Sequence, residues 1–208
     1  IARMARAQSR FGAVEVMAVT KTQSSETVNA AWDAGLTVIG ENRVQEIREK
    51  LPILQRNFQI HQIGQLQSNK VKYIIEDVSL IHSVDRLSLA EEIDRQAQKH
   101  DRVMDVLVQV SPAGEEQKGG MPPEAVHGFL EQARKLPGVR VKGLMAVMPN
   151  TPDRAYLTEL FQNMRRLFEQ LQTEAVAGID MQELSMGMSG DYDLAAACGA
   201  TMVRVGSA

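Results

Sequence analysis

One lysine of this sequence lies where covalent chemistry is most easily placed, at the end of an apolar strand. Residues 14–22, VEVMAVTKT, form an apolar run that ends in Thr20 and Lys21. The run predicts a strand buried on both faces, the pattern of a parallel sheet. A lysine where such a strand opens into a loop can attack a carbonyl, since partial burial lowers the pKa of an amine. Taken alone, the segment favours a simpler role for Lys21, that of solubilising the strand end.

Two pairs of small residues near the end of the sequence indicate a phosphate site. Ser189-Gly190 and Gly206-Ser207 each combine a hydroxyl with an unhindered backbone N–H, and each follows a predicted strand. Ser189-Gly190 is expected to open a short helix. One such pair is more often a turn than a site, but two pairs at adjacent strand exits favour phosphate binding.

A reactive lysine opposite a phosphate cradle permits two chemistries. The first is a Schiff base between Lys21 and a phosphorylated sugar, as in aldolases. The second is a Schiff base between Lys21 and pyridoxal 5′-phosphate (PLP), a cofactor anchored by its phosphate. The residue types leave both open.

Strand-like and helix-like segments alternate along the whole sequence and would position these residues. Eight strands are predicted, at residues 14–19, 36–39, 58–63, 80–82, 104–110, 139–147, 183–186 and 201–205. Eight such units in 208 residues match a small (β/α)8 TIM barrel of the α/β class, whose strand exits all ring one mouth. A doubly wound open sheet is the competing arrangement.

The helical segments carry recognisable signals. Ser88 and Glu91 have the spacing of a capping box, and Gly64 begins a stretch expected to lead into a helix ending near Glu76. Residues 1–11 are expected to form a basic helix that starts before Ile1 and serves as the eighth outer helix. The strongest helical stripe consists of Leu157, Leu160, Phe161, Met164, Leu167, Phe168 and Leu171, and is expected to face the core.

Composition excludes several classes of protein. The net charge of −3 provides no basic field for nucleic acid and no polybasic membrane patch. No apolar run approaches the roughly 20 residues that a membrane span needs. Cys198 is the only cysteine, and the four histidines show no metal-ligand spacing. We therefore expect a cytoplasmic protein without a disulfide or a metal.

Six ordered segments resemble a known family. They are VMAVTKT, GENRVQE, HQIGQLQSNK, GLMAVMP, LSMGMSGDY and VRVGSA. In this order and spacing they resemble the PLP homeostasis protein family, also called the proline synthetase co-transcribed family. The resemblance implies a fold-type III barrel similar to the N-terminal barrel of alanine racemases, here as a single domain over residues 1–208.

The resemblance also implies a set of cofactor-binding residues. Lys21 would form the Schiff base with PLP, and Arg204 would face the pyridine nitrogen. The phosphate would be held by Ser189, Gly190, Gly206 and Ser207, and the ring pocket would be lined by Asn42, Met145, Ser185 and His61. For His61 a structural role as a strand-end histidine is an equal alternative. Ser207 stands where the family often has threonine, and the printed sequence ends at Ala208, where the family typically continues with an Ile-Phe-Gly type tail.

Arginine at the pyridine nitrogen has a consequence for the chemistry. It donates a hydrogen bond, so the nitrogen stays unprotonated and the ring is a weaker electron sink than one paired with a carboxylate. Racemases of this type add a tyrosine base from a second domain. Tyr73, Tyr156 and Tyr192 are not obviously placed to replace it.

The function expected from the resemblance is therefore PLP binding in the service of PLP homeostasis, without evident amino-acid chemistry and not as an enzyme. The alternatives are a fold-type III enzyme such as an amino-acid racemase, and, more remotely, a phosphosugar aldolase-like barrel. We expect a monomer that contacts PLP-dependent enzymes transiently and binds neither nucleic acid nor membranes.

Overall fold

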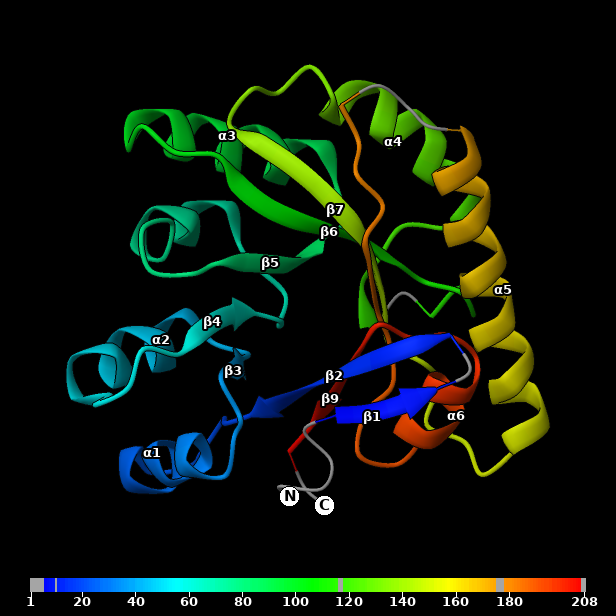
Figure 1. Cartoon of the computed structure of the whole chain (residues 1–208). Helices are drawn as coiled ribbons and strands as arrows, with labels where there is room; N and C mark the ends of the chain where they lie inside the picture. Colours follow the sequence, from blue (N-terminus) through cyan, green and yellow to red (C-terminus); the bar gives the residue numbers. More distant parts are fainter. Residues whose placement is uncertain (1–5, 10, 116–117, 175–177, 207–208) are drawn as a thin grey trace.

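Parallel strands form a closed barrel at the centre of the molecule (Figure 1). The computed structural model describes residues 6–9, 11–115, 118–174 and 178–206. The barrel strands are β2 (Gly12–Val19), β3 (Val38–Glu41), β4 (Gln59–Gln62), β5 (Leu80–Val84), β6 (Met104–Val110), β7 (Val139–Ala146), β8 (Glu183–Ser185) and β9 (Met202–Val205). Each pairs in parallel with the next, and β2 pairs with β9. This closure confirms the predicted (β/α)8 TIM barrel, and the open doubly wound sheet is wrong.

The helix predicted at the start of the chain is wrong for the residues described there. Residues 6–9 form β1 (Arg6–Ser9), which pairs antiparallel with the start of β2. Ser9 pairs with Gly12, and Gly12 has a φ of 120°, which glycine adopts readily. A hairpin therefore forms where a helix was expected. Residues 1–5 and 10 lie outside the described part of the chain.

Helices surround the barrel and connect its strands (Figure 1). They are α1 (Ser25–Asp33), α2 (Val44–Lys50), η1 (Leu51–Ile53), η2 (Ser68–Tyr73), α3 (Leu87–Lys99), η4 (Pro123–Ala125), α4 (Val126–Ala133), α5 (Arg154–Glu174) and α6 (Tyr192–Ala197). Six members of the predicted stripe on α5 are buried, and Leu167 is half-buried. The core-facing prediction for this helix is confirmed.

Two helix predictions are wrong. The capping box fails because α3 begins at Leu87, and its N-cap, Arg86, makes no side-chain capping bond. The helix expected between Gly64 and Glu76 is a short 3₁₀ segment, η2. Its N-cap, Gln67, makes no side-chain capping bond, and the segment ends at Tyr73, before Glu76.

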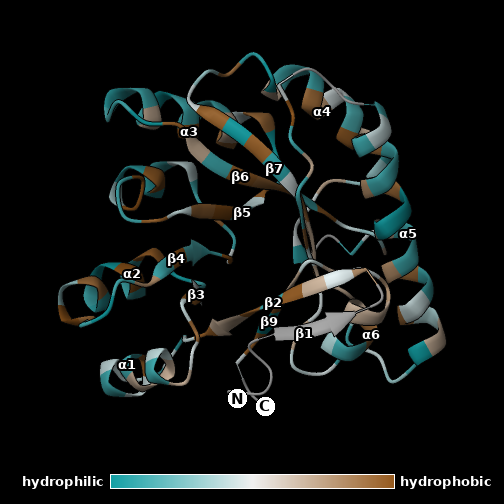
Figure 2. Cartoon of the chain, viewed as in Figure 1, coloured by the Kyte–Doolittle hydropathy of each residue, from teal (hydrophilic) through white to brown (hydrophobic). Residues whose placement is uncertain are grey.

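The apolar core lies mainly between the strands and the helices that cover them (Figure 2). β6 is buried along nearly its whole length, as predicted. β2 is not buried on both faces, because Glu15 is exposed and Val16 only half-buried while Val14 and Met17 are buried. Several polar side chains inside the barrel are buried, namely His61, His82, Gln109, Ser185 and Arg204, beside apolar ones such as Met17, Leu107 and Met145. The barrel interior therefore contains both polar and apolar side chains.

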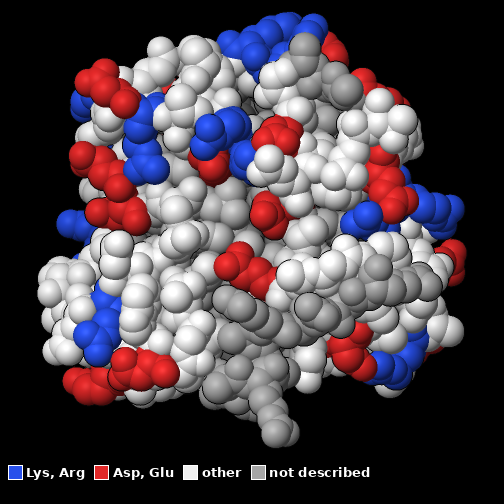
Figure 3. Space-filling view, in the orientation of Figure 1, with Lys and Arg blue, Asp and Glu red and all other residues white. Residues whose placement is uncertain are grey.

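On the face shown in Figure 3, acidic and basic side chains are interspersed, and neither sign forms a broad field. Among the described helices, none combines the length and the apolar character needed to cross a bilayer.

Candidate functional site

A cleft of about 390 Å³ lies where β2, β8 and β9 end. It is lined by Val19, Lys21, Thr22, Gln23, Met188, Ser189, Gly190, Arg204 and Gly206, and we call it the Lys21 cleft. Its volume falls in the range of small-molecule sites, about 300–1,000 Å³. Five of the predicted site residues therefore share one cleft: Lys21, Ser189, Gly190, Arg204 and Gly206.

Lys21 occupies a sharp turn directly after β2. Its side chain is exposed, which differs from the partial burial expected of it. The next residue, Thr22, has a φ of 63°, a conformation that a β-branched residue rarely adopts and that costs on the order of 1 kcal/mol. Such a turn persists only where surrounding contacts hold it.

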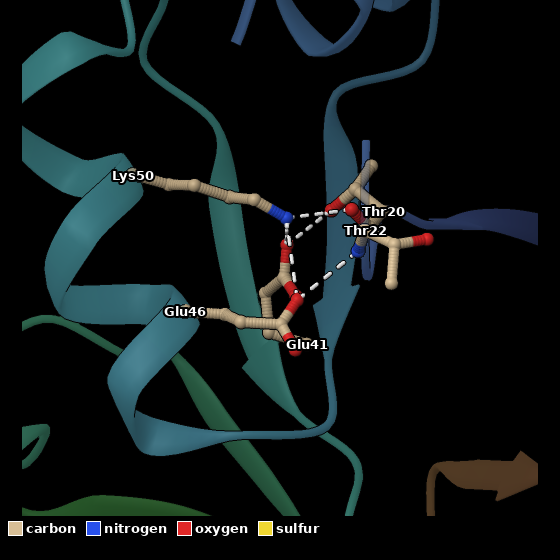
Figure 4. Close-up of polar contacts among 5 residues, drawn as sticks. All are labelled: Thr20, Thr22, Glu41, Glu46 and Lys50. Carbon is tan, nitrogen blue, oxygen red and sulfur yellow. Dashed lines mark hydrogen bonds and ion pairs between the residues drawn. The ribbon is translucent and has the colours of Figure 1, made fainter. Parts of the chain in front are cut away.

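Those contacts come from a cluster of charged residues on β3 and α2 (Figure 4). Glu41, which is buried, accepts a hydrogen bond from the Thr20 hydroxyl at 2.5 Å and pairs with Lys50 at 2.6 Å. Lys50 also donates to the backbone oxygen of Thr20 at 2.6 Å. Glu46 accepts from the backbone N–H of Thr22 at 3.2 Å. Both neighbours of Lys21 are thus anchored, while Lys21 itself faces the cleft.

Burial governs the protonation of Glu41. It raises the pKa of this carboxyl above 4.5, although hydrogen bonds from Lys50 and Thr20 act in the opposite direction. One carboxylate oxygen, Oε2, has no hydrogen-bond partner among the described residues. The cluster therefore depends on Lys50 to keep a buried carboxylate charged.

The opposite wall of the Lys21 cleft is formed by the loops after β8 and β9. The backbone N–H of Gly206 donates to the Ser189 hydroxyl at 3.2 Å, which ties the two loops together. The Asp191 carboxylate accepts from the backbone N–H of Met188 at 2.6 Å and closes the turn between them. Ser189 and Gly190 do not open a helix as expected, since α6 begins at Tyr192. Ser207 lies outside the described residues.

Packing requires a glycine at position 206 of this wall but not at position 190. A Cβ on Gly206 would approach the Cβ and backbone oxygen of Val19 to 3.0 Å, so packing explains this glycine. A Cβ on Gly190 would meet nothing within 4 Å, and its φ lies outside the left-handed region. Neither packing nor conformation therefore requires a glycine at position 190, and the space beside it is open to a ligand.

Arg204 forms the floor of the cleft and is almost completely buried. Its guanidinium donates to the hydroxyl and backbone oxygens of Ser185, at 2.7 and 3.0 Å, and to the backbone oxygen of Ala146 at 2.8 Å. Burial lowers the pKa of Arg204 to about 10, partly offset by Asp191. The group therefore remains charged at neutral pH.

A chain of hydrogen bonds continues from Arg204 through the barrel interior. Nδ1 of His82 lies 3.1 Å from the Ser185 hydroxyl, and its Nε2 lies 3.0 Å from Nδ1 of His61. Two sets of protons satisfy these contacts: either Ser185 donates to His82 and His82 to His61, or His61 donates to His82 and His82 to Ser185, with Arg204 donating to Ser185 in both. In each set one ring nitrogen of His82 donates and the other accepts, so His82 is neutral, and burial favours the neutral form of His61 as well. His61 borders a small cavity of about 190 Å³ at the opposite end of the barrel.

The neutral histidines make stability depend on pH. Burial lowers the pKa of His61 from 6.5 to about 4, so between these values the unfolded state binds more protons than the folded state. Acidification from pH 6.5 to 4 is expected to lower the free energy of unfolding by about 3 kcal/mol through His61 alone. Burial, His61 and Arg204 lower the pKa of His82 in the same direction.

Urea unfolding at pH 7, 5.5 and 4.5 measures this dependence. His61→Gln is expected to remove about 2.5 kcal/mol of it over this pH range, whereas His127→Gln, a change on α4 outside the barrel, should leave it intact. An unchanged pH dependence in His61→Gln would contradict the assignment.

The remaining predicted residues lie elsewhere. Asn42 is half-buried and lines a second cleft, between α2 and η2. Met145 is buried against Leu80 and Leu107 within the barrel. Ser185 lies behind Arg204, and His61 is separated from Ser185 by His82. The structure therefore does not place these four residues in the lining of the Lys21 cleft.

Sequence reasoning missed the residues that hold Lys21 in place. Glu41 and Glu46 both fall in the segment GENRVQE, and Glu41 lies beyond the strand predicted at residues 36–39. Glu41 instead ends a buried strand. A charged residue directly after three buried strand positions was the available signal. The described tyrosines do not line the Lys21 cleft.

The chain is similar in sequence to a known protein family. The family model for the alanine racemase N-terminal domain matches residues 1–208. The pyridoxal phosphate homeostasis protein of Aquifex aeolicus is 40% identical over 210 residues, covering 99% of this chain and 91% of that protein.

Two solved structures show the same barrel. PipY of Synechococcus elongatus with PLP bound has a TM-score of 0.85 and 36% identity, covering 93% of this chain and 91% of PipY. The alanine racemase of Clostridium difficile has a TM-score of 0.78 at 16% identity, covering 93% of this chain but 54% of the racemase. The racemase is therefore similar in fold alone and extends well beyond this barrel.

Proposed function

Because the chain belongs to the pyridoxal phosphate homeostasis protein family, we propose that it binds PLP in the Lys21 cleft and serves PLP homeostasis. One observation carries the proposal: an anchored lysine, a Ser-Gly turn and a buried arginine share a single cleft. The relative PipY, with PLP bound, supports the identity of the ligand.

The residues of the Lys21 cleft fit the phosphate, the aldehyde and the ring nitrogen of PLP. The open space beside Gly190 can take a phosphate, with the Ser189 hydroxyl and nearby backbone N–H groups as donors. Lys21 supplies an amine in the same cleft. Arg204 supplies a buried cationic donor for the ring nitrogen. Gly206, and Ser207 beyond the described residues, complete the proposed phosphate site.

The ring pocket is proposed to include Asn42, Met145 and Ser185 as well. Ser185 would act through Arg204, since its hydroxyl and carbonyl both hold the guanidinium. Met145 pairs with Ser185 across β7 and β8 and supports it from the neighbouring strand. Asn42 borders the mouth from β3. Residues 1–208 would act together as one PLP-binding domain.

When bound, PLP supplies an aldehyde that condenses with an amine to a Schiff base. Lys21 must release a proton to attack, and its exposed position allows water to accept it. The Glu41–Lys50–Glu46 cluster keeps the turn fixed, so the backbone at Lys21 loses little freedom on binding. Arg204, charged at neutral pH, disfavours a proton on the ring nitrogen and so weakens the electron sink.

A role in homeostasis rather than catalysis is supported by two observations. The lining of the Lys21 cleft contains no tyrosine, histidine or carboxylate that could serve as a second base, among the described residues. The relatives at 34–40% identity carry the name homeostasis protein. We propose a cytoplasmic monomer that passes PLP to dependent enzymes through transient contacts.

Deuterium exchange separates this role from a racemase. The protein with PLP is incubated with L- and D-alanine in deuterated water, and exchange at the α-carbon is followed by proton NMR. We expect exchange no faster than that produced by free PLP, because none of the described residues that line the cleft is a second base. Faster exchange that is lost with Lys21→Ala would establish an enzyme instead.

Gly190→Ala tests the phosphate site. The added methyl group would enter the space reserved for phosphate, so PLP affinity is expected to fall about tenfold, equivalent to about 1.4 kcal/mol. The free energy of unfolding should change by less than about 0.5 kcal/mol, since the methyl meets no protein atom. Gly128→Ala on α4, where a Cβ also meets nothing, is the matched control and should retain PLP affinity. Equal affinity of both variants would remove Gly190 from the site.

A further inference from the structure

A second cleft, of about 450 Å³, lies between α2 and η2 and is not used by the proposed PLP site apart from Asn42 at its edge. It is lined by Asn42, Arg43, Val44, Gln45, Arg48, Gln65, Leu66, Gln67, Lys70 and Tyr73, and we call it the Tyr73 cleft. Eight of its ten lining residues fall in GENRVQE and HQIGQLQSNK, two of the six segments singled out in the sequence, and Arg48 and Tyr73 follow these segments.

All the charged side chains that line the Tyr73 cleft are positive. Arg43, Arg48 and Lys70 line it, and the lining includes no carboxylate. None of the three takes part in an ion pair within the described part of the chain. Asp77 lies within electrostatic reach of Arg48 but outside the lining. On a chain with net charge −3, this is an unneutralised concentration of positive charge.

The Tyr73 ring contacts two of these cations, Arg48 and Lys70, together with Lys72, which lies outside the lining. The guanidinium carbon of Arg48 lies 5.1 Å from the centroid of the Tyr73 ring, and the amines of Lys70 and Lys72 lie at 5.7 and 4.9 Å. Each contact is favourable by itself, but the three cations repel one another. An anion placed among them would relieve this repulsion.

The other side chains of the cleft supply neutral hydrogen-bonding groups. Gln65 and Gln67 are exposed, and each amide can both donate and accept. Such groups suit the hydroxyls of a small organic molecule. The volume of the cleft is that of a small-molecule site rather than of a surface for a macromolecule.

We propose that the Tyr73 cleft binds a small phosphate-bearing anion, either free phosphate or a phosphate monoester. Arg48 and Lys70 would bind the phosphate oxygens, with Arg43 at the rim, and the glutamine amides would bind the ester's hydroxyls. The site is separate from Lys21 and goes beyond PLP homeostasis, since it needs neither a Schiff base nor PLP.

NMR titration of ¹⁵N-labelled protein tests the proposal. PLP is first reduced onto the protein with borohydride so that the Lys21 cleft is filled, and inorganic phosphate, ribose 5-phosphate or pyridoxine 5′-phosphate is then added. We expect saturable shifts of the side-chain amides of Gln65 and Gln67. Tighter binding of an ester than of inorganic phosphate identifies an ester as the occupant, and equal binding identifies free phosphate.

Variants distinguish binding in the Tyr73 cleft from non-specific attraction of an anion to positive side chains. Arg48→Gln with Lys70→Gln should weaken binding about a hundredfold, roughly tenfold for each cation lost. Arg56→Gln removes a cation that pairs with Asp33 outside the cleft and should bind as the unaltered chain does. Absence of saturable shifts, or equal weakening in the control, would overturn the proposal.

If PLP cannot be loaded, the same titration on the ligand-free protein still decides the matter. Shifts at Gln65 and Gln67 report the Tyr73 cleft, whereas shifts at the backbone amides of Ser189 and Gly190 report the Lys21 cleft. Failure of one site is therefore distinguishable from failure of the other.

Discussion

Replacing Lys21 by alanine is expected to abolish covalent PLP binding. The yellow absorbance band of the Schiff base should be lost from the protein, and affinity should fall at least a hundredfold, about 2.7 kcal/mol. Other lysines cannot substitute, because Lys21 is the only lysine in the lining of the described Lys21 cleft. The phosphate and ring contacts would remain, so weak noncovalent binding should persist.

The free energy of unfolding of Lys21→Ala shows whether a loss of PLP binding is caused by a loss of folding. The side chain of Lys21 is exposed and carries no hydrogen bond on which a neighbouring element depends, so the free energy of unfolding should change by less than about 0.5 kcal/mol. Lys99→Ala, at the exposed end of α3, is the matched control and should keep the absorbance band. A band that survives in Lys21→Ala would mean that another amine holds the ligand.

Arg204→Gln is expected to cost both stability and PLP binding. The change leaves the buried carbonyl oxygens of Ser185 and Ala146 without their donor and breaks the chain to His82. We expect the free energy of unfolding to fall by about 4 kcal/mol, since each orphaned buried group costs about 1–3 kcal/mol. The measurement is urea unfolding at pH 7.

A surface arginine provides the comparison. Arg154 pairs with Asp193 at 2.6 Å with both side chains largely exposed, so Arg154→Gln should cost less than about 1 kcal/mol. PLP affinity should fall in Arg204→Gln and not in Arg154→Gln. Equal stability of the two variants would show that the guanidinium of Arg204 does not support the barrel interior.

The barrel was predictable because its signals are local. β6 and the buried stripe of α5 follow directly from apolar patterning, and the number of alternating units, eight, favours the closed barrel over an open sheet. The start of the chain was not predictable in this way. A hairpin forms there in place of the expected helix, because residues 6–9 pair with the exposed start of β2. The sequence of these four residues alone does not predict this tertiary contact.

The residues that could bind the ligand were predictable from the sequence, whereas the residues that hold them in place were not. Lys21, Ser189, Gly190 and Arg204 meet in one cleft because the strand exits of a barrel converge. Glu41 was missed because a carboxylate in a polar segment gives no sign that it will be buried beneath Thr20. The connection from Arg204 to His61 joins strands far apart in the sequence, and no spacing reveals it.

Mapping the attachment site tests the central claim most directly. The protein is mixed with equimolar PLP, reduced with borohydride, digested and analysed by mass spectrometry for the phosphopyridoxyl group. We predict a single label on the peptide that contains Lys21. A label spread over surface lysines, or concentrated on a different lysine, would contradict the proposal that the Lys21 cleft binds PLP.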